Sequence, residues 1–252
     1  MNINTLREAL KEDSYVCFTT DLDWAPECAI EKTINLFKEN QIRPTVFVTH
    51  HSSIIEQNAD IIDIGIHPNF IFPSSQGESM EEIIEYCMRL APDTKVFRAH
   101  RWFASNDIYD KLWEKGIRYE SNLCSRQEII APFVHRSGMI SFPVFFEDGA
   151  YIIENEILNF ESIKEQFLQK GLKVINIHPM HYALNTPYFT YTREIKDRLT
   201  RTEWNSMDEE KLSELSYKGA GIRNLIDDMI KFCRDENNHV KIVTLNQLYN
   251  TL

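Results

Sequence analysis

The chain lacks several features that would assign it to a specialised class of protein. Its five cysteines are scattered and form no C-x-x-C pair. This argues against a disulfide framework or a zinc–cysteine site and favours reduced thiols in the cytosol. The first residues lack the apolar stretch of a signal peptide, and no window reaches the apolar length of a membrane span. These absences predict a soluble, cytoplasmic protein without a transmembrane segment.

Basic residues are also scarce. The chain has 27 Lys and Arg against 38 Asp and Glu, which gives a net charge of −11. This balance argues against nucleic acid or an anionic membrane as the main partner, although it leaves room for a local basic pocket that binds a phosphate or a sugar acid. No repeat, low-complexity tract or linker divides the chain, so we expect a single domain over residues 1–252. Nothing in the sequence indicates an oligomeric state.

The sequence does contain apolar runs that alternate with amphipathic stretches. The predicted strands are 15–21, 44–49, 61–66, 95–99, 117–122, 139–146, 172–178 and 240–244, and the predicted helices are 3–11, 26–41, 53–57, 79–90, 106–115, 160–170 and 221–235. This alternation is typical of parallel βα units. An open doubly wound sheet would carry a Gly-rich phosphate loop after its first strand, and this chain has none there. The polar excursion at 182–218 is expected to shape a substrate cleft.

Six of the apolar runs end in ionisable or metal-binding side chains. The first ends in Asp21-Leu22-Asp23, and the others end in His50-His51, His67, Arg98-Ala99-His100, Glu147-Asp148 and His178-Pro179-Met180-His181. The carboxyl ends of parallel strands meet at one face of a barrel, and barrel enzymes build their active sites there. We therefore expect these groups to converge on one site.

Asp21 and Asp23 are the most informative pair. If the strand continues through both, their side chains point to the same face about 6–7 Å apart. One carboxylate can then hold a metal ion while the other accepts a proton from water. The alternative is that Asp23 only caps the helix that follows at Pro26.

The other strand ends supply partners for a metal-dependent reaction. Asp23 and His67 are the first two ligands we would choose, in a donor set that suits zinc and also manganese, cobalt or iron(II). Asp21 would then be the general base. Arg98 could keep that carboxylate ionised or grip a substrate anion, and His178 could protonate a leaving amine.

The chain resembles a known family at these positions. Phe18-Thr19-Thr20-Asp21-Leu22-Asp23 resembles the first motif of the polysaccharide deacetylases, the NodB-homology or carbohydrate esterase family 4 group. Arg98-Ala99-His100-Arg101-Trp102 is similar to its arginine-plus-aromatic motif, and Ile175-Asn176-Ile177-His178 to its late histidine motif. The resemblance covers roughly residues 15–180. It implies a distorted (β/α)7 barrel, Asp21 as base, Asp23 and His67 as metal ligands, Arg98 as the residue that tethers the base, and His178 as acid.

The sequence departs from the family pattern at the metal site. The family has a second histidine four residues after the first, and here that position is Ile71. Asn69, Gln76 or His50 could replace it, and His50 is chemically the best ligand of the three. Two ligands alone would make a weak site. We expect His100, Trp102, Glu147 and His181 to contact the substrate.

The sequence therefore predicts a metal-dependent hydrolase, with zinc as the expected metal. By the resemblance, it would remove an N-acyl group, such as acetyl, from an amino sugar or glycan in surface-polysaccharide (lipopolysaccharide) biosynthesis. One alternative is a barrel that has lost a metal ligand and binds a glycan or a partner without turnover. Another is a hydrolase of a different linear amide.

Overall fold

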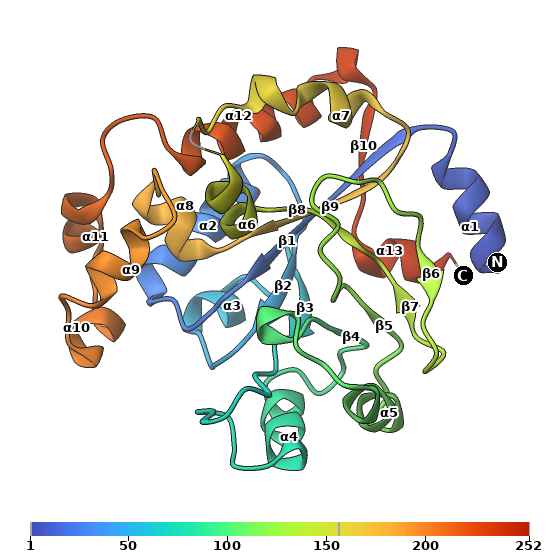
Figure 1. The fold of residues 1–252 in the computed structure, drawn as a ribbon, viewed down its shortest axis with the longest axis horizontal. Coiled ribbons are helices and arrows are strands. Elements are labelled where there is room, and N and C mark those ends of the chain that lie inside the picture. The colour runs from blue at the N-terminus through green and yellow to red at the C-terminus, as the bar shows by residue number, and fades with distance from the viewer. Residues whose placement is uncertain (1, 156, 252) are drawn as a thin grey trace.

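The computed structural model describes residues 2–155 and 157–251. Its strands form one curled sheet that is mostly parallel (Figure 1). They are β1 (Ser14–Asp21), β2 (Thr45–Val48), β3 (Asp63–Ile66), β4 (Val96–Phe97), β5 (Tyr119–Glu120), β6 (Phe133–Val134), β7 (Ile140–Ser141), β8 (Val144–Glu147), β9 (Gly171–Ile177) and β10 (Val240–Ile242). Apart from β1 and β9 the strands have four residues or fewer, and several predicted strands are shortened by one or two residues at an end.

The helices cover the outside of the sheet. They are α1 (Ile3–Leu10), α2 (Glu27–Glu39), α3 (Ser53–Gln57), α4 (Met80–Leu90), α5 (Asn106–Glu114), α6 (Asp148–Glu154), α7 (Lys164–Leu168), α8 (Pro179–Leu184), α9 (Tyr191–Lys196), α10 (Arg201–Asn205), α11 (Glu209–Leu215), α12 (Ile222–Arg234) and α13 (Leu245–Asn250). Short 3-10 turns lie at His100–Trp102, Phe160–Ser162 and Glu236–Asn238. The alternation of strands and helices that the sequence predicts is confirmed.

The sheet runs in the order β6-β7-β5-β4-β3-β2-β1-β9-β8, and β10 also pairs with β1. Every neighbouring pair is parallel except β6 with β7. The predicted strand 139–146 is in fact two strands, because Pro143 lacks the N–H that a continuous ladder needs. β7 pairs with β5 near one end of the sheet and β8 pairs with β9 at the other end, so this one segment connects the two ends of the curled sheet. The distorted barrel is therefore confirmed as the fold class.

Alternation along β1 sets the interior of the barrel. Cys17 belongs to a buried apolar cluster with Phe47 and Val174, and α1 and α13 supply Leu6 and Leu245 to the same cluster. Val16 and Phe18, on the opposite face of β1, pack in a second cluster with α2, α7 and α12. The inward positions that follow Cys17 are Thr19 and Asp21. The apolar interior therefore gives way to polar groups toward the carboxyl end of β1.

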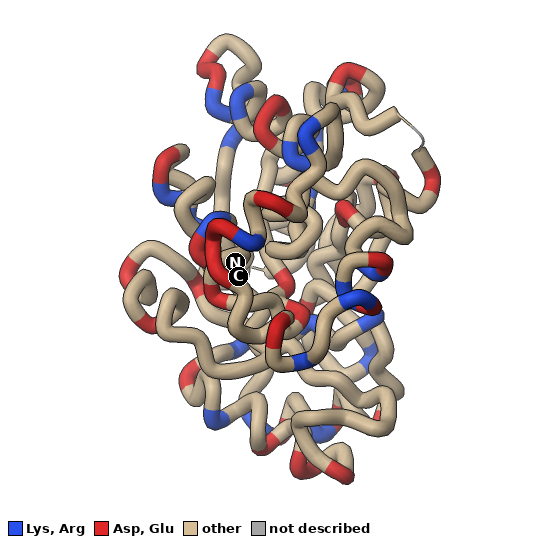
Figure 2. The backbone as a smooth tube through the Cα atoms, turned by 90° about the vertical axis from the view of Figure 1, so that its left-hand side faces the viewer, with Lys and Arg blue, Asp and Glu red and all other residues tan. Residues whose placement is uncertain are grey.

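The predicted excursion at 182–218 is mainly helical and forms the end of α8 together with α9, α10 and α11. These helices gather on the side of the molecule opposite α1 and α13 (Figure 1). On the outer surface, Lys and Arg alternate with Asp and Glu along the helices and loops, without a broad basic face in this view (Figure 2). No helix in the described ranges is long and apolar enough to cross a bilayer.

Candidate active site

A buried arginine organises the carboxyl end of the barrel. The Arg98 side chain is fully buried, and its Nη1 donates to Asp21 Oδ1 at 2.8 Å, Thr19 Oγ1 at 2.9 Å and Asn176 Oδ1 at 2.7 Å. The rest of the guanidinium donates to Ser121, from Nε to the backbone oxygen at 2.6 Å and from Nη2 to Oγ at 2.8 Å. A guanidinium held in this way is not free to turn toward a substrate, and in this arrangement it fixes the Asp21 carboxylate.

The Asp21 carboxylate is held by both of its oxygens. Oδ1 accepts from Arg98, and Oδ2 accepts from Asn176 Nδ2 at 2.8 Å. The side chain is almost completely buried. These bonds leave the carboxylate little freedom to rotate, which is the arrangement expected of a positioned base.

Asp23 lies at the centre of a second cluster. β1 ends at Asp21, and the chain then turns through left-handed backbone at Asp23 (φ 45°) and Trp24 (φ 55°). His67 Nε2 lies 3.1 Å and His100 Nδ1 3.0 Å from the same oxygen, Asp23 Oδ1. Burial disfavours the carboxylate, but hydrogen bonds from His100 and His67 hold the pKa of Asp23 well below its usual value.

The pairing of β3 with β4 brings these two histidines together. Ile66 is the partner of Phe97, and His100 N donates to Pro68 O at 2.9 Å. The ligand atoms of Asp23, His67 and His100 all lie within 4.8 Å of one another. His100, predicted as a substrate contact, is therefore a candidate third metal ligand.

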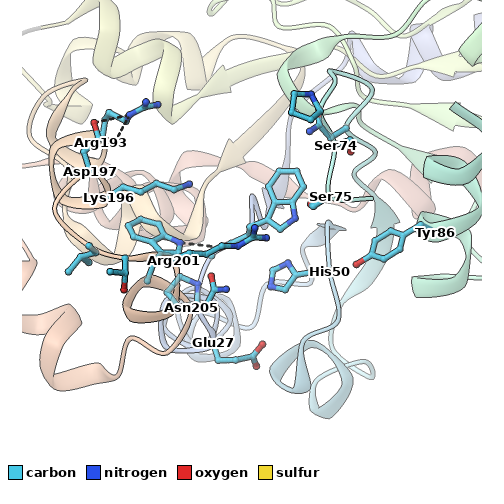
Figure 3. Close-up of a pocket in the computed structure, with 18 residues that line it drawn as sticks. Glu27, His50, Ser74, Ser75, Tyr86, Arg193, Lys196, Asp197, Arg201 and Asn205 are labelled. Carbon is cyan, nitrogen blue, oxygen red and sulfur yellow. Dashed lines mark hydrogen bonds and ion pairs between the residues drawn. The ribbon is translucent and has the colours of Figure 1, made fainter. Parts of the chain in front are cut away.

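His50 does not join this cluster, contrary to the sequence prediction. Thr49, one residue earlier, faces the turn after β1 and accepts a hydrogen bond from Trp24 N at 3.2 Å. His50 Nδ1 bonds to Thr49 Oγ1 at 2.8 Å, and the ring lies in a neighbouring cavity (Figure 3). The alternation of side chains beyond β2 thus turns His50 away from Asp23.

The other two alternatives for the third ligand, Gln76 and Asn69, form hydrogen bonds to the backbone instead. Gln76 is buried, and its Nε2 donates to Thr49 O and His67 O, each at 3.1 Å. Its Oε1 accepts from Asn69 N at 2.6 Å. Asn69 Oδ1 accepts from Ile71 N at 3.0 Å. Gln76 therefore ties the ends of β2 and β3 together, and neither amide is placed as a ligand.

His178 lies across the site from the His67–His100 pair. Its Nε2 is 3.7 Å from Asp23 Oδ2 and 3.9 Å from Asp21 Oδ2, and its Nδ1 is 2.5 Å from Asp148 Oδ1. Asp148 Oδ2 also accepts from His178 N at 2.7 Å. Burial opposes a charged ring, but the carboxylate of Asp148 outweighs it and raises the pKa of His178 well above its usual value.

The remaining predicted substrate contacts lie around this centre. Glu147 Oε1 is 3.2 Å from His178 Nδ1, but its carboxylate also caps α6 by accepting from Gly149 N and Ala150 N, and burial raises its pKa to about 7. The His181 ring packs edge-on against His178 with centroids 5.7 Å apart. Trp102 covers the Arg98 guanidinium at 5.6 Å. Contact of these three side chains with a substrate stays a prediction.

Sequence reasoning gave no role to Asp148, Asn176 and Ser121. Asp148 follows a strand end and was visible as an acid without a partner. Asn176 stands inside the late histidine motif, two residues before His178, so it shares the face of β9 that carries the site. Ser121 gives no signal in sequence, because it acts mainly through a backbone oxygen.

Comparisons with known proteins identify the family of the chain and support its fold. A family model described as "WbmS-like: Polysaccharide deacetylase" matches residues 18–195. The structure is similar to that of WbmS from Bordetella bronchiseptica, described as a candidate polysaccharide deacetylase involved in O-antigen biosynthesis, with a TM-score of 0.77 and 23% identity over 92% of this chain and 94% of that one. It is also similar to a candidate polysaccharide deacetylase from Mycobacterium smegmatis, with a TM-score of 0.59 and 14% identity over 95% and 90% of the two chains. No curated protein sequence matches the chain.

Proposed function

Because this chain belongs to the WbmS-like polysaccharide deacetylases, we propose that it is a metal-dependent hydrolase that removes an N-acetyl group from an amino sugar during O-antigen or related surface-glycan assembly. The family match supports the reaction class. The similarity to the Bordetella protein supports the biosynthetic setting, and the cluster around Asp23 supports metal dependence.

The donor set at Asp23 fits a divalent ion. It offers one carboxylate oxygen and two imidazole nitrogens from separate strand ends, and the two nitrogens face the same oxygen. His67 Nδ1 is buried without a hydrogen-bond partner in the described part of the chain, so hydrogen bonding alone does not account for the orientation of this ring. Carboxylate with neutral imidazole suits zinc, and manganese, cobalt and iron(II) accept the same set. When bound here, such an ion would act as a Lewis acid toward the amide carbonyl and lower the pKa of water.

Asp21 is the base in this proposal. Arg98 and Asn176 fix both of its oxygens, so it can accept a proton from the attacking water without losing its orientation. It lies deeper in the barrel than Asp23, which leaves Asp23 for the ion. The two carboxylates of the first strand end thus take different roles.

His178 is the acid. Its Nδ1 is occupied by Asp148, so the proton on Nε2 faces the space above Asp21 and Asp23. The raised pKa keeps the ring protonated near neutral pH in the structure as it stands. His178 would donate this proton to the sugar nitrogen as the C–N bond breaks, and the nitrogen would leave as an amine.

The observation that carries the proposal is the convergence of His67 and His100 on one oxygen of Asp23. Metal content of the purified protein, measured by mass spectrometry, tests it. Asp23→Ala and His100→Ala should each lose bound metal, while His50→Ala should keep it as a matched control. Metal lost from His50→Ala and kept in His100→Ala would overturn the assignment of His100.

Activity tests the roles in the reaction. Acetate release from a panel of N-acetylated amino sugars should fall by about a hundredfold or more in Asp21→Asn, with metal content unchanged. Full activity in this variant would exclude Asp21 as the base. A protein that holds metal but releases no acetate from any N-acetyl sugar would instead point to a glycan-binding role or to a different amide.

A further inference from the structure

A cavity of about 1120 Å³ opens beside the site described above (Figure 3). Trp24 belongs to its lining and packs edge-on against His100 with ring centroids 5.3 Å apart, so one side chain separates the cavity from the candidate metal ligands. One wall is built by α9, α10 and the turn between them. The facing wall carries Ser74, Ser75 and Tyr86.

The wall formed by α9 and α10 is cationic. Arg193, Lys196 and Arg201 all line the cavity. Arg193 is neutralised by Asp197, with Nε 2.9 Å from Oδ1. Lys196 and Arg201 form no ion pair with any described residue, and the Lys196 ammonium lies 5.1 Å from the Trp204 ring. Among the described residues, Lys196 and Arg201 are therefore the two cations of this wall that are not in an ion pair.

The cavity lining also contains two acids, Asp197 and Glu27. Glu27 also lines the cavity, but its Oε2 accepts from Ser52 Oγ, Ser53 Oγ and Ile54 N at 3.0–3.1 Å, at the start of α3. The His50 ring is kept neutral because burial lowers its pKa. The lining carries three cations, Arg193, Lys196 and Arg201, against two acids, Glu27 and Asp197. In a chain with a net charge of −11, such a locally basic cavity beside the active site favours an anionic ligand.

We propose that this cavity binds the diphosphate of a glycosyl diphosphate, whose N-acylated sugar lies across Trp24 at Asp21 and His178. The proposal rests on the deacetylase function and names the substrate class for the same site. A neutral glycan would give the cations nothing to bind. A sugar carboxylate would not need so large a volume, because the carboxylate is attached directly to the sugar ring. A glycosyl diphosphate supplies both a strong anion and a further group to occupy the cavity.

Two sources could supply this chemistry, a nucleotide-linked and a lipid-linked sugar. The probes that separate them are UDP, farnesyl diphosphate and inorganic diphosphate, titrated into the full chain by calorimetry. Lys196→Ala/Arg201→Ala should weaken the binding of at least one of the first two probes by about tenfold to a hundredfold. Tighter binding of UDP than of inorganic diphosphate would assign the nucleotide source, and tighter binding of farnesyl diphosphate would assign the lipid source.

Lys38→Ala/Arg234→Ala is the matched control, because it removes two exposed cations that do not line the cavity. It should bind the probes as the wild type does. The titrations are repeated in Asp23→Ala, because a diphosphate can also bind a metal ion. Binding that disappears in Asp23→Ala but is unchanged in Lys196→Ala/Arg201→Ala would overturn the proposal, as would equal binding by the cavity and control variants.

Failure of the deacetylase function would look different. Probe binding would still depend on Lys196 and Arg201, but no N-acetyl sugar, linked to diphosphate or not, would release acetate. Conversely, neutral N-acetyl sugars could release acetate while probe binding is unchanged in Lys196→Ala/Arg201→Ala. That result would support the deacetylase function and exclude the diphosphate site.

Discussion

Asp148 holds His178 at two points: Oδ1 lies 2.5 Å from the ring Nδ1, and Oδ2 accepts the backbone N–H at 2.7 Å. Asp148 is completely buried, and although burial disfavours its charge, His178 lowers its pKa. The pair therefore places a proton on the imidazole Nε2 that faces Asp21. Removing the carboxylate should alter both the orientation and the charge of the ring.

Asp148→Asn tests this relationship. The amide cannot stabilise the imidazolium, so the pKa of His178 should fall and the protonated acid should be lost at lower pH than in the wild type. We expect acetate release to drop by about a hundredfold at neutral pH, with the alkaline limb of the pH–rate profile shifted to lower pH. Metal content should stay at the wild-type level. A pH profile identical to that of the wild type would show that Asp148 has only a structural role.

Glu120, at the end of β5, predicts a pH dependence of stability. Its side chain is almost completely buried, and burial raises its pKa to about 7 from an ordinary value of 4.5. The folded state therefore holds this proton more tightly than the unfolded state does. The contribution to stability is fully present below pH 4.5 and is lost as the pH rises through 7. The loss is about 3 kcal/mol.

Glu120→Gln removes this titration. The free energy of unfolding of the variant, relative to that of the wild type, should rise by about 3 kcal/mol between pH 4.5 and pH 8. Urea denaturation at the two pH values measures it. Glu12→Gln, at an exposed position, is the control and should show no such rise. A difference for Glu120→Gln that does not change with pH would mean that the carboxyl titrates alike in the folded and unfolded states.

The fold could be predicted because its main signal is local. Apolar runs alternate with amphipathic helices, and Asp21, His67, Arg98 and His178 each follow such a run directly. Their meeting at one end of the barrel then needs only the rule for parallel strands. The split at Pro143 was also readable in principle, since proline interrupts a ladder, but the apolar run on both sides of it predicts a single strand.

The candidate third ligand, His100, could not be identified from the sequence in the same way. His100 lies 33 positions from His67 in the sequence, and only the register of β3 against β4 places them side by side. A search among the neighbours of His67 favours Asn69, Gln76 or His50 instead. His50 follows a neighbouring strand end, but successive side chains alternate there, so Thr49 faces the turn after β1 and His50 points away from it. Asn176 and Ser121 could not be predicted for the same reason, because their contacts depend on where the fold places the Arg98 guanidinium.

Gln76 provides a test of this account of the loop after β3. Its amide satisfies two backbone oxygens, of Thr49 and His67, and one backbone N–H, of Asn69. Gln76→Ala should leave these groups unpaired in a buried place and lower the free energy of unfolding by about 2–4 kcal/mol. His67 should then be held less firmly, and metal affinity should fall by about tenfold to a hundredfold, as for other residues that orient a ligand. Chemical denaturation and competition with a chelator measure the two effects.

Asn69→Ala is the control, because it removes only the bond to Ile71 N. It should lower the free energy of unfolding and the metal affinity less than Gln76→Ala does. If Gln76→Ala kept full stability but lost its metal, Gln76 would itself be a ligand, and the assignment of His100 would need revision.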